Sequence, residues 1–395
     1  MILRQVVILV GGLGSRLGEL TKKTPKPILK INNKRFLDVL IENFIRFGFS
    51  KITLLSSYKF KKFNKIYNNK SINSAKIKCI NEGKPRGTGG ALIKSINKFD
   101  NYFLFCNGDT FFDINYLDFF LKSKKNKTFN VAISNKNKKK RFSFVKLNNS
   151  HITGFNIKNG NYVNSGYYII NKKKLVSKKF KSRNSSLEND IFPFLIKKKE
   201  VTYVNFKKEF LDIGIKSDLK KADNYLKKVL KKKVAILDRD GVINYDYGYV
   251  HKINKFKLRK NIVNFIKLLN DKNYYVFVIT NQSGIGRGYY SEEDVHRLHN
   301  YLDKKLHQKG AHIDEYFFSP YYAKSKIKKY KTGLNYRKPN IGFFREINKK
   351  YSIQLEGSFM IGDQLSDYYF AKKAKIKYFD ANKIKNLLNL SSFVK

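Results

Sequence analysis

Two aspartates one residue apart follow a short apolar run in the segment VAILDRDGVIN, residues 234–244. A carboxylate can attack phosphorus and form an aspartyl-phosphate, provided that a metal masks its charge and a second acid protonates the leaving alkoxide. Aspartates at i and i+2 at the end of a strand fit this need, because the chain turns there and lets the side chains part. We therefore predict Asp238 as the nucleophile and Asp240 as the acid and base.

Three further polar segments follow in order: FVITN with Thr280 and Asn281, YRKPN with Lys338, and FMIGDQLSD with Asp363 and Asp367. With the DRDG segment, they resemble the four motifs of the haloacid dehalogenase superfamily. The resemblance implies that Thr280 and Asn281 grip the phosphoryl oxygens and that Lys338 tethers nucleophile and phosphate.

The same resemblance implies a magnesium site. Its ligands would be Asp238, Asp363 and the backbone carbonyl of Asp240. Oxygen donors of this kind suit Mg²⁺.

The spacing leaves no room for a large cap domain, because Thr280 follows Asp238 by 42 positions and Lys338 follows Thr280 by 58. The segments DRDGVIN, NQSGIGRGYY and RKPN are similar to the heptose-bisphosphate and histidinol phosphatases. Those relatives usually carry a zinc loop of Cys and His before the RKP segment. No Cys or His lies between Tyr316 and Lys338, so we expect no structural zinc.

Other side chains in this half have weaker signals. We expect Arg287 and Arg337 to bind the distal phosphate or the sugar, because guanidinium groups bind oxyanions at two points. His296 and His299 could chelate a metal at i and i+3, but no third ligand is in sight, and they are expected to be ordinary helix residues. Packing among Tyr321, Tyr322 and Tyr336 is our hypothesis for what replaces the zinc loop.

The chain opens with a second type of motif, VVILVGGLGSRLGELTKKTPKP, in which a strand runs into a glycine-rich turn. Backbone amides in such a turn can face phosphate oxygens, and basic side chains can neutralise them. A tight turn between strand and helix is the alternative reading of the glycines alone. The candidate residues are Gly11, Gly12, Gly14, Ser15, Arg16 and Lys26.

The turn is followed by GKPRGTGGAL, CNGDT, NSGYYII, SLEND and FLDIGIKSDLKKA. In this order the segments resemble the sugar-1-phosphate nucleotidyltransferases over residues 1 to 225, most closely the heptose-1-phosphate guanylyltransferases. In the implied reaction all the reacting groups are anionic, so charge neutralisation, here by Arg16 and Lys26, is the main catalytic need.

The resemblance assigns roles to individual residues. The glycine turn with Ser15 and Arg16 would bind the triphosphate and the base edge, and Lys26 would bind phosphate. The remaining candidates are Gly87 and Thr88 for the nucleobase, Asp109 and Asp212 for magnesium, and Asn164, Glu188 and Lys158 for the sugar. Ser15 stands where relatives commonly have Thr, and Ile157 stands where many have an acidic residue, so the fit to a particular sugar is open.

Strands that alternate with helices must position these side chains. Runs such as VVILV, KITLLS, YFLFC, VAILD, YYVFVITN and SFMIGD predict strands, and FLDVLIENFIRFG and IVNFIKLLNDKN predict helices. Ligands bind at the carboxyl ends of strands in such sheets. We predict an α/β protein with two Rossmann-like domains: a nucleotidyltransferase domain with a mixed, GT-A-like sheet over 1–228, and a capless, haloacid-dehalogenase-like domain with a parallel sheet over 232–395.

Composition limits the remaining alternatives. The 395 residues carry a formal charge of +52, but the lysines are spread along the chain, and we prefer codon bias to polyanion binding as the explanation. Only Cys79 and Cys106 are present, and no apolar stretch is long enough for a membrane span, so we expect a cytoplasmic protein with no membrane or nucleic-acid partner. A homo-oligomer is compatible with the sequence.

Together the resemblances imply a bifunctional enzyme with magnesium in both domains. The second domain would remove the 7-phosphate of D-glycero-D-manno-heptose 1,7-bisphosphate, and the first would join the 1-phosphate to a nucleotide, giving GDP-heptose with GTP. One alternative is a mannose-1-phosphate or other hexose-1-phosphate nucleotidyltransferase fused to a histidinol-phosphatase-like enzyme. A more distant alternative is a non-catalytic, nucleic-acid-binding protein, which would bind with a steep dependence on salt.

Overall fold

The computed structural model describes residues 2–31, 33–73, 75–136, 142–181 and 183–394. The chain divides into two compact units, one of residues 3–226 and one of residues 227–395 together with Ile2. The helix α8 (Lys216–Leu230) runs across the division. The prediction of a two-domain α/β protein is therefore confirmed, and each unit is described by itself.

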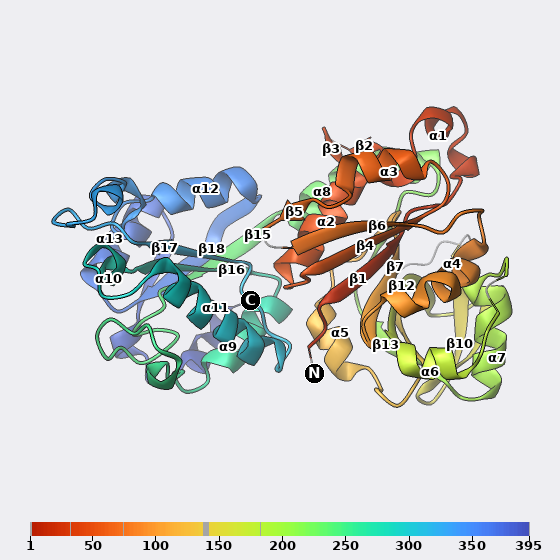
Figure 1. Ribbon diagram of the computed structural model, residues 1–395. Coiled ribbons are helices and arrows are strands. Elements are labelled where there is room, and N and C mark those ends of the chain that lie inside the picture. The colour runs from red at the N-terminus through yellow and green to blue at the C-terminus, as the bar shows by residue number, and fades with distance from the viewer. Residues whose placement is uncertain (1, 32, 74, 137–141, 182, 395) are drawn as a thin grey trace. The chain divides into compact units, whose positions relative to one another are not determined.

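The first unit is built on a ten-stranded mixed sheet (Figure 1). Its strands, in spatial order, are β10 (Phe144–Asn148), β11 (His151–Ile157), β13 (Val201–Phe206), β9 (Phe129–Ser134), β12 (Val163–Asn171), β7 (Tyr102–Asn107), β1 (Gln5–Leu9), β4 (Lys51–Ser56), β6 (Ala75–Asn81) and β5 (Ser71–Ile72). Strand β1 pairs in parallel with both β4 and β7, whereas β12 is antiparallel to β7 and β9.

One pairing in this sheet was not foreseen. Strand β10 also pairs with β12, so β10, β11, β13, β9 and β12 close into a ring of paired strands. The sequence analysis predicted a mixed sheet but not this closure, because the joining contacts of β10–β12 and β11–β13 are single residue pairs that leave no pattern in the sequence.

Apolar strands and amphipathic helices explain why this unit folds. Four of the five residues of β1 are buried, as expected for a strand covered on both faces. The helix α2 (Phe36–Arg46) buries Phe36, Leu40 and Phe44, which are spaced one helical turn apart. The other helices are α1 (Glu19–Lys23), α3 (Phe60–Tyr67), α4 (Gly87–Ser95), α5 (Tyr116–Lys122), α6 (Lys172–Ser177) and α7 (Phe192–Lys197).

The first unit also has two small antiparallel sheets. They are β2 (Lys30–Ile31) with β3 (Lys34–Arg35), and β8 (Thr110–Phe111) with β14 (Leu211–Asp212).

The second unit has a five-stranded sheet in which every pair is parallel. Its order is β17 (Glu315–Ser319), β16 (Tyr275–Asn281), β15 (Lys232–Leu237), β18 (Ile353–Gly362) and β19 (Lys377–Asp380). Because all five strands run the same way, the polar residues after β15, β16 and β18 meet at one edge of the sheet.

Helices cover both faces of this sheet (Figure 1). Alternate residues of β15 enter different cores: Ala235 and Leu237 pack with α9 (Ile262–Asp271) and α11 (Glu292–His307), and Val234 and Ile236 pack with α12 (Gly342–Lys350) and α13 (Leu365–Ala374). The short α10 (Ser283–Gly286) follows β16. In the part of the chain that the structure describes, no helix is both long enough and apolar enough to cross a membrane.

Candidate active sites

The residue that follows the central strand β15 is Asp238, and it is paired with a buried lysine. Lys338 Nζ lies 2.9 Å from Asp238 Oδ2 and 2.6 Å from Asp367 Oδ1, and all three side chains are almost fully buried. The sequence prediction placed Lys338 beside Asp238 but gave Asp367 no role. Asp367 was named in the fourth motif, but its pairing with Lys338 was not predicted.

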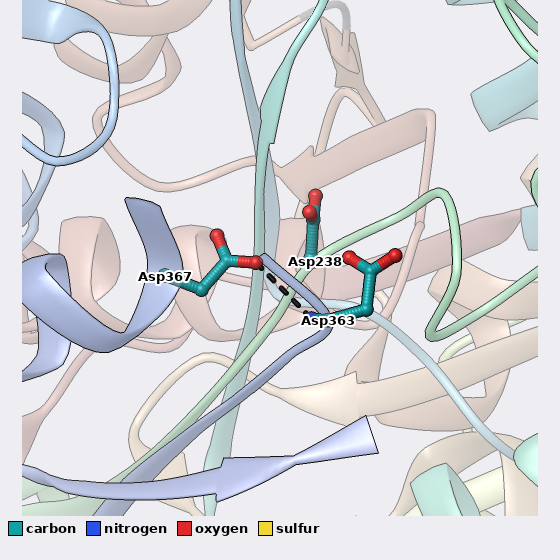
Figure 2. A group of neighbouring side chains, drawn as sticks. All are labelled: Asp238, Asp363 and Asp367. Atoms are coloured by element: carbon teal, nitrogen blue, oxygen red, sulfur yellow. Dashed lines mark hydrogen bonds between the residues drawn. The ribbon is translucent and has the colours of Figure 1, made fainter. Parts of the chain in front are cut away.

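Asp363 completes a group of three carboxylates. One oxygen from each of Asp238, Asp363 and Asp367 lies within 4.8 Å of the others. Figure 2 shows the three side chains and the hydrogen bond from the Asp363 backbone N–H to Asp367 Oδ2 (3.2 Å). They come from the ends of β15 and β18 and from the first turn of α13.

A glycine lets the Asp363 carboxylate approach the backbone that follows Asp240. Gly241 has φ +78°, and a Cβ at this position would lie 2.2 Å from Asp363 Oδ2. Asp363 therefore packs directly on the backbone of the DRDG turn, where the carbonyl of Asp240 was predicted as a metal ligand. Only glycine combines this backbone conformation with such a close contact.

The charges of this cluster suit a divalent cation. Three carboxylates against one ammonium group leave two formal negative charges in a largely buried place. Burial is the main cause that raises the pKa of Asp238, and Asp367 adds to the rise, whereas Lys338 opposes it. Burial also raises the pKa of Asp363. Oxygen donors with surplus negative charge match what Mg²⁺ binds, so the residues fit the predicted metal.

The second aspartate, Asp240, is held in a hydrogen-bond network. Arg239, which is fully buried, donates to both of its carboxylate oxygens at 2.7–3.2 Å. Asn244 Nδ2 donates to Oδ1 (2.9 Å), and Gln282 Nε2 donates to Oδ2 (2.8 Å). The sequence analysis foresaw neither Arg239 nor Gln282 in this role.

Thr280 and Asn281, at the end of β16, make different hydrogen bonds. The Thr280 hydroxyl accepts a hydrogen bond from Gln282 Nε2 (2.9 Å), so its own proton is available for a phosphoryl oxygen. The side chain of Asn281 instead donates to the Lys338 carbonyl (3.1 Å) and accepts from its N–H (3.0 Å). The Asn281 side chain thus positions Lys338, and its contact with phosphate stays a prediction.

The two predicted substrate arginines lie near each other. Burial, and next the charge of Arg287, lower the pKa of Arg337. The guanidinium carbon of Arg287 lies 3.8 Å from the centre of the Tyr322 ring, and Arg337 donates to the Tyr321 carbonyl at 3.3 Å. Two neighbouring guanidinium groups suit an oxyanion, but their contact with substrate stays a prediction.

The loop before Lys338 offers no zinc ligand, and its described contacts are of another kind. The rings of Tyr321 and Tyr336 lie 6.5 Å apart, as the packing hypothesis expected, but Tyr322 packs under Arg287 instead. Tyr330 is buried in a cluster with Ile285, Tyr290 and Val295, a contact that the hypothesis missed. The Ser325 hydroxyl donates to the Gly286 carbonyl at 2.6 Å.

In the described part of the chain, His296 and His299 pack against aromatic rings, as expected for ordinary helix residues. His299 is buried and stacks on Tyr316 with ring centres 4.3 Å apart, and His296 packs against Phe318. Burial, and next the charge of Arg239, lower the pKa of His299 well below its usual value.

In the first unit, the glycine turn follows β1 as predicted. Gly14 adopts φ +69° and precedes a short 3-10 helix of Ser15–Leu17, while Gly12, Ser15 and Arg16 are exposed. A Cβ on Gly11 would lie 2.8 Å from the Ser57 backbone nitrogen, which accounts for glycine there. An exposed turn of this kind is open to a triphosphate, and the binding roles remain predictions.

Three charged residues of this unit lie together. Lys26 Nζ lies 2.6 Å from Asp109 Oδ2. Strands β8 and β14 pair Thr110 with Asp212, and the Thr110 hydroxyl lies 3.3 Å from Asp109 Oδ1 and 3.5 Å from Asp212 Oδ2. The two carboxylates therefore flank one hydroxyl, and two hard oxygen ligands suit a magnesium ion that also binds substrate oxygens.

The residues predicted to bind the base lie at the start of α4. Gly87 has φ +68° and no room for a Cβ, which would lie 2.5 Å from the Ser185 carbonyl oxygen. The Thr88 hydroxyl accepts a hydrogen bond from the Leu187 N–H at 2.9 Å. These contacts join α4 to the SLEND segment, and the nucleobase contact stays a prediction.

Two of the predicted sugar residues are connected by a tyrosine. Asn164 Nδ2 donates to the Tyr168 hydroxyl (2.8 Å), which in turn donates to Glu188 Oε1 (3.2 Å). Tyr168 was missed, although it stands in the NSGYY segment. Lys158 is exposed just after β11, and its role stays a prediction.

Each of the two units matches a known family. The family described as nucleotidyl transferase matches residues 5–229, and the family described as polynucleotide kinase 3 phosphatase matches residues 233–384.

Curated relatives match the second unit. The chain is 40% identical over 149 residues to D-glycero-beta-D-manno-heptose-1,7-bisphosphate 7-phosphatase of Rhodopseudomonas palustris, covering 38% of this chain and 83% of the relative. It is 38% identical over 146 residues to D-glycero-alpha-D-manno-heptose-1,7-bisphosphate 7-phosphatase of Photorhabdus laumondii, covering 37% of this chain and 80% of the relative.

A solved structure matches the first unit. HddC from Yersinia pseudotuberculosis, complexed with GMP-PN, has a TM-score of 0.51 and 28% sequence identity, and the match covers 57% of this chain and all of HddC (100%).

Proposed function

Because the chain belongs to the nucleotidyl transferase family and, in its second unit, to the heptose-1,7-bisphosphate 7-phosphatases, we propose that it is a bifunctional enzyme of nucleotide-sugar synthesis. It removes the 7-phosphate of D-glycero-D-manno-heptose 1,7-bisphosphate and transfers a nucleotidyl group to the resulting heptose 1-phosphate. The pairing of Lys338 with Asp238 inside a cluster of three carboxylates is the observation that most supports the first reaction.

In the phosphatase reaction, an Asp238 oxygen attacks the 7-phosphorus while the bond from phosphorus to the sugar oxygen breaks. Asp240 gives a proton to that sugar oxygen, and the product is heptose 1-phosphate with an aspartyl-phosphate on Asp238. A water molecule then attacks the phosphorus, Asp240 takes its proton, and phosphate leaves. Thr280 donates to a phosphoryl oxygen, and Lys338 balances negative charge throughout.

Asp238, Asp363 and the Asp240 carbonyl would hold magnesium in this domain, and Asp109 and Asp212 would hold it in the other. The ion would supply positive charge against the reacting phosphates. No structural zinc belongs to the proposal, because the segment between Tyr316 and Lys338 has no thiolate or imidazole ligand.

In the transferase reaction, an oxygen of the sugar 1-phosphate attacks the α-phosphorus of a nucleoside triphosphate, and the bond to the β-phosphate breaks. The products are a nucleotide sugar and pyrophosphate. Arg16, Lys26 and the amides of the glycine turn neutralise the phosphates. The match to HddC, whose structure holds GMP-PN, supports a guanine nucleotide, and therefore GTP, as the second substrate.

The order of the reactions follows from the chemistry of the product. The phosphatase yields a sugar 1-phosphate, which is what the transferase consumes, so the two domains act in series. The named phosphatases include both anomers, so the anomer is left open. A nucleotide heptose is a precursor for cell-surface glycans such as lipopolysaccharide, capsule or S-layer glycans.

We assign the transferase to residues 1–228, with a GT-A-like sheet, and the capless phosphatase to residues 232–395. The partners in the proposal are small molecules, with no membrane or nucleic acid, and the oligomeric state is open. Cytoplasmic location is part of the proposal, and the two free, buried cysteines support it.

The test uses two single substitutions in the full chain, Asp238→Asn and Asp109→Ala. With heptose 1,7-bisphosphate, GTP and magnesium, the unaltered enzyme should release phosphate and then pyrophosphate. Asp238→Asn should release neither from the bisphosphate but should form pyrophosphate when heptose 1-phosphate is supplied. Asp109→Ala should release phosphate only. Pyrophosphate formation by Asp238→Asn from the bisphosphate alone would contradict the proposed order.

A further inference from the structure

A buried tyrosine is connected to the phosphatase site through one glutamine. Gln282 Nε2 donates both to Asp240 Oδ2 (2.8 Å) and to the Thr280 hydroxyl (2.9 Å), and the Tyr290 hydroxyl donates to Gln282 Oε1 (2.6 Å). Gln282 is 2% exposed and Tyr290 is 9% exposed. The chain of contacts thus leads from Tyr290 to the proposed acid and to the phosphoryl-binding hydroxyl.

Chemistry fixes the direction of these hydrogen bonds. Asp240 Oδ2 accepts from Arg239 as well, and the Tyr290 hydroxyl donates to the Gln282 oxygen, so the nitrogen of the Gln282 amide faces Asp240 and its oxygen faces Tyr290. Burial, above all, raises the pKa of Tyr290 to about 12, so the hydroxyl keeps its proton and donates at neutral pH. Without this donor, a buried carbonyl oxygen would lose its partner and the amide would be free to rotate.

The ring of Tyr290 is itself fixed in place. It packs with Ile285, Val295 and Tyr330, and a Cβ on Gly284 would lie 2.2 Å from its Cε1 atom. The ring also stacks on His251, with ring centres 4.9 Å apart and planes 9° apart. The two rings line a cavity of about 530 Å³.

We propose that Tyr290 is a positioning residue of the phosphatase, which acts through Gln282 on Asp240 and Thr280. The inference rests on the proposed phosphatase function. Tyr290 touches neither Asp238 nor Lys338 in any described contact, so it has no direct part in the attack on phosphorus. Its effect should therefore be largest where departure of the leaving group needs the acid.

Substrates with different leaving groups test this inference. A sugar oxygen leaves only with a proton, whereas p-nitrophenolate leaves readily without one. In the full-length enzyme, Tyr290→Phe should lower kcat/KM about three- to tenfold for heptose 1,7-bisphosphate, which is the effect of one net hydrogen bond. For p-nitrophenyl phosphate the decrease in kcat/KM should stay below about twofold, because only the hydrogen bond from Gln282 to Thr280 then affects the rate.

A matched control and a double variant complete the experiment. Tyr274 is also buried, and its hydroxyl donates to the Gly357 carbonyl at 3.2 Å, so Tyr274→Phe should change neither rate. Gln282→Leu should lower the sugar-phosphate rate more than Tyr290→Phe, and the double variant should match Gln282→Leu alone, because both changes break one chain of contacts.

Equal losses on both substrates, no loss at all, or additive effects in the double variant would each overturn the role of Tyr290. Phenyl phosphate gives the same comparison without heptose, because phenolate is a poorer leaving group than p-nitrophenolate. If the unaltered enzyme hydrolyses the aryl phosphates but not heptose bisphosphate, the proposed substrate is wrong while the positioning role is still measured.

Discussion

Substituting Gly241 by alanine should disturb the predicted magnesium site while leaving the fold of the second domain intact. The new Cβ would lie 2.2 Å from Asp363 Oδ2 and 2.5 Å from its Cγ. Ordinary contacts of such atoms exceed about 3.4 Å, so Asp363 must move by roughly 1 Å. Misplacement of this size at a reacting centre costs about 100-fold in rate, and we expect that loss in phosphate release.

Gly248→Ala provides the matched control. Gly248 has φ +73°, close to the value at Gly241, but its Cβ would meet no atom within 4 Å. Both substitutions put a side chain into the left-handed region, at about 1–2 kcal/mol each. Both should lower the Tm of the second domain by a few degrees, about 2–8 °C.

The assay measures phosphate release from heptose 1,7-bisphosphate over a range of magnesium concentrations. Gly241→Ala should need more magnesium and stay slow at saturation, whereas Gly248→Ala should keep nearly full activity. Pyrophosphate formation from heptose 1-phosphate should be unchanged in both, which checks that the chain is intact. Equal phosphatase activity in the two variants would refute the link between Gly241, Asp363 and the metal.

Three other predictions follow from the same contacts. Lys338→Met leaves three carboxylates without their cation, so it should abolish phosphate release and destabilise the second domain by about 3 kcal/mol in urea unfolding; unchanged stability would contradict the buried pairing. His299 stays neutral in the fold because burial lowers its pKa, whereas the unfolded chain takes up a proton near pH 6.5, so stability should fall as pH drops from about 7 to 5. His299→Gln should flatten that slope in urea titrations, and an unaltered slope would show that the histidine is not its source. A zinc-selective chelator should leave phosphatase activity intact while EDTA abolishes it until magnesium is restored, and a loss reversed only by zinc would reveal a zinc site.

Much of the fold could be predicted from local pattern. The apolar runs became β1, β4, β7, β15, β16 and β18, and the segments with helical spacing became α2 and α9. The closing pair β10–β12 could not be predicted, because one contact between residues distant in sequence depends on the packing of the whole sheet.

The candidate phosphatase site was also predicted only in part. Asp238, Lys338 and Asp363 could be predicted together because each follows the end of a parallel strand or stands in a recognisable motif. Asp367 was not predicted as a partner of Lys338. It lies in the first turn of α13, where an acidic residue is expected to cap the helix, and that expectation hid its second role.

The network around Asp240 was beyond sequence reasoning. Arg239 points into the interior and back to its neighbour Asp240, whereas an arginine beside two aspartates would be expected at the surface. Gln282 and Tyr290 meet through a turn whose close packing depends on Gly284. Such contacts arise from tertiary geometry that residue type and spacing do not encode.

The most direct test of the central claim is the mass of the nucleotide sugar formed when the whole enzyme receives heptose 1,7-bisphosphate, magnesium and an equimolar mixture of nucleoside triphosphates. We predict one product, GDP-heptose, without a phosphate on the 7-position. A nucleotide sugar that keeps the second phosphate, or no nucleotide sugar while heptose 1-phosphate accumulates, would contradict a phosphatase and a transferase that act in series.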